Sequence, residues 1–284
     1  MAVAPVATAL AAEKESVSVP RQSLEEAPPL AICAEGLLKR FGTCQALNGF
    51  SLHVPQGAFY ALLGPNGAGK STSLALLNGV LKPDAGSVCV FGVDALKHPL
   101  EIKRSCGAVP EELALFERLT SRQQLLFSAR MFGLNGQQAQ RRTDELLEVL
   151  ELSSKANELV ASLSKGMRRR LAIASALIHS PRLVLLDEPF EGVDIMASDI
   201  IRSLLMRLSK QGVSILLTTH VLEIAEKMAS HVGIVVEGKM AMEGRLELLQ
   251  QQHKAASLEA LFFQAAPKPK TASLALSFFE TEGT

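Results

Sequence analysis

The chain carries short apolar runs of the kind that form buried β-strands. Residues 31–63 contain several such runs separated by turn signals, and the last of them, 59–63, is the wholly apolar segment FYALL. Residues 182–190 and 212–220 are rich in apolar and β-branched side chains, a composition that suits buried parallel strands. Residues 200–212 have helical periodicity and suit the crossover helix that two parallel strands need.

A segment of different character lies among these strands. Residues 118–134, 141–152 and 165–180 each space their apolar positions as helices do. We therefore expect an α/β fold in which a helical insert, at about residues 112–180, separates two halves of a sheet domain.

The two ends of the chain differ from its middle. Residues 1–30 are rich in Ala, Ser, Pro and Glu, which predicts a disordered extension. Residues 231–244 predict a closing hairpin, and residues 246–284 predict a terminal helix over 246–264 followed by a flexible tail. The principal domain is therefore expected to span residues 31–245.

Composition argues against a nucleic-acid-binding surface, a disulfide framework and a membrane span in this chain. Lys plus Arg and Asp plus Glu each total 29, so the formal charge is zero and no basic surface for nucleic acid is expected. The four cysteines, at positions 33, 44, 89 and 106, form no CxxC pair and predict reduced thiols in a cytosolic protein. No stretch has the ~18 uncharged apolar residues of a membrane span, so another chain would have to supply any spans.

Residues 64–72, GPNGAGKST, predict a phosphate-binding loop between the strand 59–63 and a helix. Glycine backbone lets successive N–H groups point at an anion, and the following helix adds its positive end. Lys70 supplies a charge for the outer phosphates, and the Ser71 hydroxyl suits Mg²⁺. The other loop residues expected to contact phosphate are Gly64, Pro65, Asn66, Gly67, Ala68, Gly69 and Thr72. The expected ligand is a nucleoside triphosphate with Mg²⁺.

Polar groups also end the two other apolar strands. Asp187 and Glu188 follow one strand, and because side chains alternate along a strand they should point in different directions. We assign Asp187 to Mg²⁺, through a water, and Glu188 to orienting or deprotonating the attacking water. His220 ends the next strand, where ligands of parallel sheets gather, and suits the terminal phosphate or the water.

The order of five motifs resembles the ATPase subunit of ABC transporters over roughly residues 31–245. The motifs are GPNGAGKST (64–72), LSKGMRRR (163–170), LLDEP (185–189), EGVD (191–194) and TTH (218–220). Separate ATPase chains with such signatures look most like those of exporters of drugs, lipids, polysaccharides or ions. The resemblance implies an ABC-type P-loop NTPase fold: a mixed sheet core, an antiparallel β subdomain and a helical insert.

The resemblance also implies a set of roles. ATP and Mg²⁺ are expected as ligands, with Phe41 stacked on the adenine, although its ring equally suits the core. Ser164 and Gly166 belong to the signature, which would meet the γ-phosphate held by the opposite subunit, and Asp194 lies in the segment that crosses between subunits. The expected partners are an integral membrane permease and a second ATPase subunit, identical or sister, on the cytoplasmic face of the membrane.

The signature has a physical interpretation of its own. Ser164 can cap the basic helix that follows it, and the positive end of that helix suits a phosphate. Two chains arranged head to tail could then bury two nucleotides between them. The run Arg168–Arg170 is expected to lie mostly on a solvated face of the helix.

Several positions depart from the family pattern. Glu111 stands where a glutamine is common, and a carboxylate can hold a metal through water but cannot donate an amide hydrogen bond. Lys165 and Met167 replace the commoner Gly and Gln of the signature, and the crossing segment reads GVDI. Because Lys70 and Glu188 are kept, hydrolysis is expected to survive.

Two other functions remain open at this point. The chain could be a soluble regulatory or nucleic-acid ABC protein, although such proteins usually carry tandem domains, a coiled-coil insertion or a basic surface. It could also be a binding-only subunit with impaired catalysis, against which Glu188 argues.

Overall fold

The computed structural model describes residues 28–266. Residues 1–27 and 267–284 lie outside the described part, and they hold most of the predicted N-terminal extension and most of the predicted tail. Within the described part no helix is both long and apolar enough to cross a bilayer.

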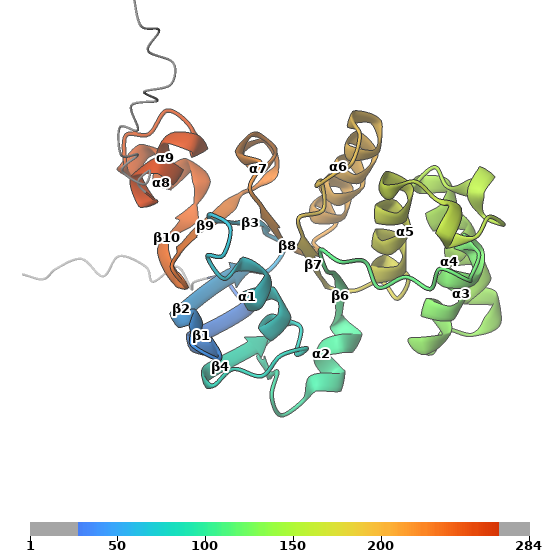
Figure 1. Cartoon of the computed structure of the whole chain (residues 1–284), viewed down its shortest axis with the longest axis horizontal. Helices are drawn as coiled ribbons and strands as arrows, with labels where there is room; N and C mark the ends of the chain where they lie inside the picture. Colours follow the sequence, from blue (N-terminus) through green and yellow to red (C-terminus); the bar gives the residue numbers. More distant parts are fainter. Residues whose placement is uncertain (1–27, 267–284) are drawn as a thin grey trace, which may run out of the picture.

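The centre of the molecule is a six-stranded sheet that is mostly parallel (Figure 1). Its strands, in spatial order, are β10 (Lys239–Arg245), β9 (His231–Val236), β3 (Phe59–Leu63), β8 (Ser214–Thr219), β7 (Leu183–Asp187) and β6 (Cys106–Val109). Strands β3, β8 and β7 are buried along their whole length, which explains their continuous apolar sequences. Only the pair β9–β10 is antiparallel, as the expected closing hairpin requires.

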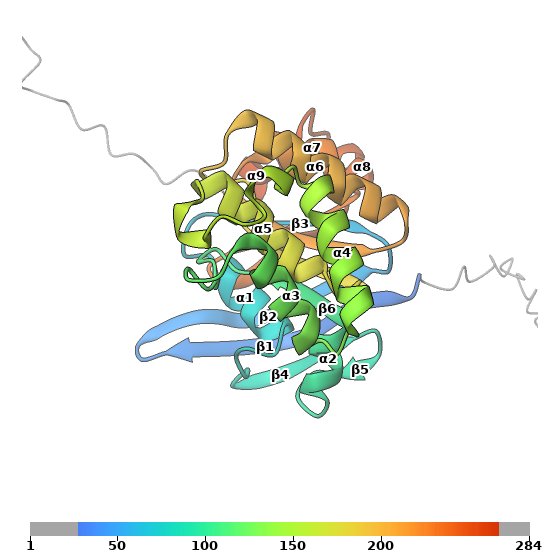
Figure 2. The same cartoon turned by 90° about the vertical axis from the view of Figure 1, so that its right-hand side faces the viewer.

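A second, antiparallel sheet packs beside the first, at the lower edge of Figure 2. Its order is β2 (Cys44–Pro55), β1 (Leu30–Phe41), β4 (Ala85–Val90) and β5 (Val93–Asp94). Ile32 on β1 and Leu52 on β2 face inward and join the core around Tyr60, whereas alternate residues face solvent. This second sheet is the antiparallel subdomain of the expected fold.

Helices pack around the parallel sheet, and the helices of the insert form a separate module beside it. The helices outside the insert are α1 (Lys70–Leu77), α2 (Pro99–Ser105), α6 (Ile195–Lys210), α7 (Leu222–Met228), α8 (Leu246–Gln252) and α9 (Leu258–Ala265). The expectation of one helix over 246–264 is wrong, because α8 ends before His253. The Ser257 side chain then accepts a hydrogen bond from the Ala260 N–H, 3.2 Å away, and starts α9.

The insert between β6 and β7 forms a helical module, at the right of Figure 1. Its helices are α3 (Ser121–Met131), α4 (Gly136–Val149) and α5 (Lys165–Leu177), with short 3₁₀ turns η1 (Ser153–Lys155) and η2 (Val160–Ser162) between α4 and α5. Each α-helix starts with a polar side chain that accepts a backbone N–H, namely Thr120, Asn135 and Ser164. The capping residues explain where each helix of the module begins.

The module joins the sheet through a close contact between β6 and α5. A Cβ atom at Gly107 would lie 2.2 Å from the carbonyl oxygen of Ala176, so only glycine allows this approach. We expect Gly107→Ala to lower the free energy of unfolding by about 1–3 kcal/mol, the usual cost of overpacking. Urea denaturation would measure it.

Gly136 gives a matched control, because nothing lies within 4 Å of a Cβ atom at that position. It is the first residue of α4, where alanine is the better helix former. Gly136→Ala should therefore leave stability unchanged or raise it. Equal losses in the two variants would show that the contact of β6 with α5 is not close-packed.

Candidate functional site

A cavity of about 480 Å³ opens at the carboxyl ends of the parallel strands. The register sets Leu63 of β3 beside Thr219 of β8, and Asp187 of β7 beside Thr218 of β8. The residues that follow these strand ends therefore meet at one edge of the sheet. The cavity is lined by Phe41, Cys44, Ala46, Asn66, Gly67, Gly69, Lys70, Ser71, Thr72, Glu111, Glu188, Glu191 and His220. Most of the residues assigned to nucleotide and metal from the sequence are among them.

The loop 64–69 connects β3 to α1 and forms one wall of this cavity. Gly69 has φ 104° and lies so close to β2 that a Cβ atom would be 2.6 Å from the Ala46 carbonyl oxygen. The Lys70 ammonium group is buried within the loop and donates hydrogen bonds to the carbonyl oxygens of Gly64 (2.8 Å) and Pro65 (3.2 Å). A positive charge is thus held inside a concave stretch of backbone.

The two acidic residues after β7 point to different partners. The Thr218 hydroxyl donates to Asp187 Oδ1 at 2.5 Å, which holds this carboxylate between β7 and β8. Glu188 leaves the strand with φ 45°, an uncommon conformation for a residue with a side chain, and lines the cavity. The change in backbone conformation separates the directions of the two carboxylates.

Glu188 and His220 form a pair at the cavity wall. The His220 Nδ1 atom lies 3.0 Å from Glu188 Oε1, and the His220 backbone N–H donates to Glu188 Oε2 at 3.4 Å. Glu188 is nearly buried, whereas about half of the His220 side chain is exposed. The carboxylate is therefore held in one orientation while the imidazole keeps one edge toward the cavity.

The arginines of the signature segment are not a solvated face, so that expectation is wrong. Arg169 and Arg170 are 2% and 8% exposed. Arg170 donates to the Leu150 carbonyl oxygen at 2.7 Å, and Arg168 donates to the carbonyl oxygens of the 3₁₀ turn η2. Their charged ends complete the hydrogen bonding of backbone that the helical module buries.

Arg169 has a second set of neighbours, which the sequence did not reveal. It donates to the Pro110 carbonyl oxygen at 3.3 Å, next to Glu111. Burial lowers the pKa of Arg169, and the nearby charges of Glu191, Glu111, Asp187 and Glu188 oppose that change. One buried cation of the helical module therefore faces the carboxylates of the cavity.

Glu191 is a further cavity residue that the sequence reasoning missed. It lies three positions after Glu188, and its N–H donates to the Glu188 carbonyl oxygen at 3.1 Å, so a tight turn brings it back to the cavity. The segment DEPFE, residues 187–191, could have indicated this position. A turn directly after the end of β7 returns the chain to the carboxyl edge of the sheet.

Phe41 lies at the cavity, whereas the signature residues Ser164 and Gly166 lie outside it. Phe41, at the end of β1, is 48% exposed at the rim of the cavity, so it is not a core residue. Ser164 and Gly166 do not line the cavity. Ser164 is exposed at the start of α5, and a Cβ atom at Gly166 would lie 3.3 Å from Asp194 Oδ2. The signature therefore packs against the start of α6 and leaves Ser164 on the surface.

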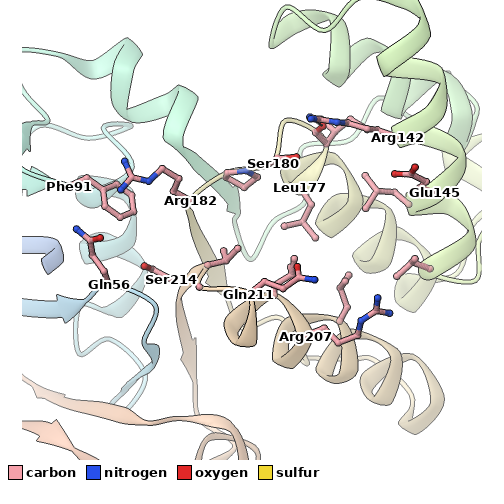
Figure 3. A pocket seen from close by; sticks show the side chains of 18 residues that line it. Gln56, Phe91, Arg142, Glu145, Leu177, Ser180, Arg182, Arg207, Gln211 and Ser214 are labelled. Atoms are coloured by element: carbon pink, nitrogen blue, oxygen red, sulfur yellow. Dashed lines mark hydrogen bonds between the residues drawn. The ribbon is translucent and has the colours of Figure 1, made fainter. Parts of the chain in front are cut away.

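A larger cavity, of about 540 Å³, lies elsewhere (Figure 3). Arg142 of α4 and Arg207 of α6 border it, together with Arg182 and Ser214 at the amino ends of β7 and β8. The Arg182 guanidinium stacks 3.9 Å from the centre of the Phe91 ring. Because ligands of parallel sheets bind at the carboxyl ends of the strands, we do not assign the nucleotide to this cavity.

The donor set of the 480 Å³ cavity fits Mg²⁺. Hydroxyl and carboxylate oxygens are the ligands that this ion prefers, and Ser71, Glu111 and Glu188 all present them to the cavity. Asp187, which directly precedes Glu188 in the sequence, is 7% exposed. One of its carboxylate oxygens accepts a hydrogen bond from the Thr218 hydroxyl.

Comparison with known proteins places these features in one family. The family model described as ABC transporter matches residues 47–191. The linearmycin resistance ATP-binding protein of Bacillus subtilis (strain 168) is 35% identical over 211 residues, which cover 74% of this chain and 68% of that protein. The bacitracin transport ATP-binding protein of Bacillus licheniformis is 34% identical over 245 residues, covering 86% and 78%.

Solved structures agree with the sequence matches. An ATP-binding subunit of an ABC transporter superposes with a TM-score of 0.77 at 29% identity, over 83% of this chain and 99% of that one. A bacterial ABC transporter cassette solved as a dimer superposes with a TM-score of 0.71 at 26% identity, over 76% and 98%. The same cassette has been solved in a post-hydrolysis state with ADP and Pi.

Proposed function

The chain belongs to the ABC transporter family, and from that membership we propose that it is the ATP-binding subunit of an exporter. It would bind and hydrolyse MgATP to drive transport through a separate membrane permease. The observation that carries this proposal is the cavity in which Lys70, Glu188 and His220 converge at the carboxyl ends of adjacent strands. A relative described as a Nod factor export ATP-binding protein, 38% identical over 224 residues, supports export as the direction of transport.

Binding of ATP follows from the loop and its helix. Backbone N–H groups of the loop and the start of α1 would hold the phosphates, and the Lys70 ammonium group would leave the carbonyl oxygens of Gly64 and Pro65 to contact the outer phosphates. Phe41, exposed at the rim, would stack on the adenine. These contacts would hold the terminal phosphate near Glu188.

Hydrolysis follows from the pair of Glu188 and His220. Glu188 would accept a proton from the attacking water, or orient it, while His220 holds the carboxylate and reaches the terminal phosphate. Ser71 and Asp187 would hold Mg²⁺, with Glu111 contributing through water, and the bound ion would neutralise charge on the phosphates. The buried positive charge of Arg169 would offset part of the negative charge of the nearby carboxylates, Glu191 and Glu111 among them.

The second half of the phosphate site would come from another ATPase subunit. Ser164 and the amino end of α5 lie on the surface, outside the cavity of their own chain. A head-to-tail pair would bring this helix end to the γ-phosphate held by the partner subunit. ATP would then stabilise the pair and hydrolysis would loosen it.

The permease contact is proposed at the junction of the helical module with β6. A cavity of about 170 Å³ lies there, bounded by the segment after β6, including Ala114, and by Phe132 and His179. The same segment contains Glu111 of the nucleotide cavity. A shift of Glu111 on binding ATP could therefore pass directly to a helix of the permease.

Co-purification from detergent-solubilised membranes tests this proposal. We expect the chain to co-purify with a membrane protein that has several spans. The resulting complex should hydrolyse ATP. Ala114→Arg should fill the 170 Å³ cavity and release that protein without affecting binding of ATP. Val80→Arg, at an exposed position outside the cavity, is the control. A chain that retains no membrane protein would contradict the transport function.

A further inference from the structure

The antiparallel sheet carries a cluster of potential metal ligands that do not line the nucleotide cavity. The Sγ atom of Cys33, a carboxylate oxygen of Glu35 and a ring nitrogen of His53 all lie within 4.8 Å of one another. Cys33 and Glu35 are two residues apart on β1, and the register sets Cys33 directly beside His53 on β2. Their neighbours Ile32, Ala34 and Leu52 are buried, so the cluster lies on the outer face of the sheet.

We propose that Cys33, Glu35 and His53 bind a divalent transition-metal ion of the zinc type. A thiolate, an imidazole and a carboxylate together select such an ion over Mg²⁺ or Ca²⁺. In a tetrahedral zinc site the ligand atoms lie roughly 3.3–3.6 Å apart. His53 Nε2 is 2.7 Å from Glu35 Oε1 and Cys33 Sγ is 4.0 Å from the same oxygen, so small side-chain rotations suffice.

The surroundings of His53 support this assignment. Its other ring nitrogen, Nδ1, lies 3.3 Å from Glu243 Oε2, which directs Nε2 toward Cys33 and Glu35. Glu243 is itself held, because its Oε1 accepts hydrogen bonds from the His53 N–H (2.7 Å) and from the buried Tyr60 hydroxyl (2.9 Å). A histidine ligand whose second nitrogen is fixed by a carboxylate is the arrangement common around protein-bound metals.

Cys89 is the nearest further thiol along the register, although its Sγ atom is not among the ligand atoms that lie within 4.8 Å of one another. It lies directly opposite Cys33 on β4, between the buried residues Val88 and Val90, and so faces the same side of the sheet. A metal ion held by Cys33, Glu35 and His53 would connect β1 with β2, and through Glu243 it would link them to β10 of the central sheet. Binding by Cys89 as well would add β4. Bound metal should therefore stabilise the fold.

Cobalt titration of the full chain, stripped with a chelator and kept reduced by a non-thiol reagent, tests the site. We expect one equivalent of Co²⁺ to give thiolate-to-cobalt charge-transfer absorption, which Zn²⁺ then removes by displacement. Zn²⁺ should also raise the melting temperature of the chelated protein. Co²⁺ in the nucleotide cavity could give a thiolate band only through Cys44, which a Cys44→Ser variant removes.

Three variants test whether Co²⁺ binds at this cluster. Cys33→Ser should abolish the band or weaken Co²⁺ binding at least ~10-fold, and Glu243→Gln should weaken it about 10–100-fold. Cys44→Ser removes an exposed thiol outside the cluster, in the nucleotide cavity, and should leave the band and the affinity for Co²⁺ unchanged. Melting in chelator shows that the variants fold. Absence of a band in the parent, or a band lost with Cys44→Ser and kept with Cys33→Ser, would overturn the proposal.

Discussion

Lys70→Ala is expected to reduce ATP hydrolysis by roughly 10²–10³-fold, the usual cost of removing one group that stabilises charge at a reacting centre. The Lys70 ammonium group is buried in the loop, with only the carbonyl oxygens of Gly64 and Pro65 as hydrogen-bond partners among the described residues. Its removal leaves the outer phosphates without a direct positive charge, so nucleotide affinity should fall as well.

Phosphate release and binding of a fluorescent nucleotide would measure the two effects of Lys70→Ala. Lys82→Ala, which removes an exposed lysine shortly after α1, is the matched control and should behave as the parent does. A Lys70→Ala protein that hydrolyses ATP within ~3-fold of the parent rate would refute the assignment of the loop.

Glu188→Gln should separate binding from hydrolysis. The amide keeps the shape of the side chain but cannot accept a proton, so we expect the rate to fall about 10²–10⁴-fold while ATP still binds. The His220 contact at 3.0 Å should survive in part, which keeps the site assembled. Single-turnover hydrolysis and equilibrium ATP binding, measured side by side, would show the separation.

Glu223→Gln is the control for this variant, because Glu223 is an exposed carboxylate in the first turn of α7. It should hydrolyse ATP as the parent does. Equal rates for Glu188→Gln and the parent would exclude Glu188 as the base and favour another cavity carboxylate, Glu111 or Glu191.

The sequence predicted many of the residues that line the 480 Å³ cavity, because the parts of that cavity are local in sequence. A strand, a glycine-rich loop and a helix are contiguous at residues 59–77, and the acidic pair directly follows an apolar strand. Parallel strands bring their carboxyl ends together, so the meeting of Lys70, Glu188 and His220 follows from topology alone.

Features that depend on tertiary contacts were missed. Periodicity places Arg169 and Arg170 on a helix, but it does not show that Leu150 and Pro110 supply carbonyl oxygens to bury them. Strand β6 has only four residues, too few for a clear apolar pattern. The Glu243–His53 contact joins residues 190 positions apart, and no local motif marks it.

We propose above all that ATP is bound between two subunits, with Ser164 of one facing the γ-phosphate of the other. A test can use the Glu188→Gln background, in which ATP should be consumed much more slowly. Ser164→Arg should leave the loop of the same chain able to bind ATP but prevent the pair from closing. Asn135→Arg is the control, because Asn135 is likewise an exposed residue that caps a helix of the module.

The most direct measurement is sedimentation velocity with saturating ATP. The Glu188→Gln parent and its Asn135→Arg derivative should sediment as dimers, and the Ser164→Arg derivative as a monomer that still binds nucleotide. A Ser164→Arg derivative that dimerises with ATP as completely as the parent would contradict the shared site.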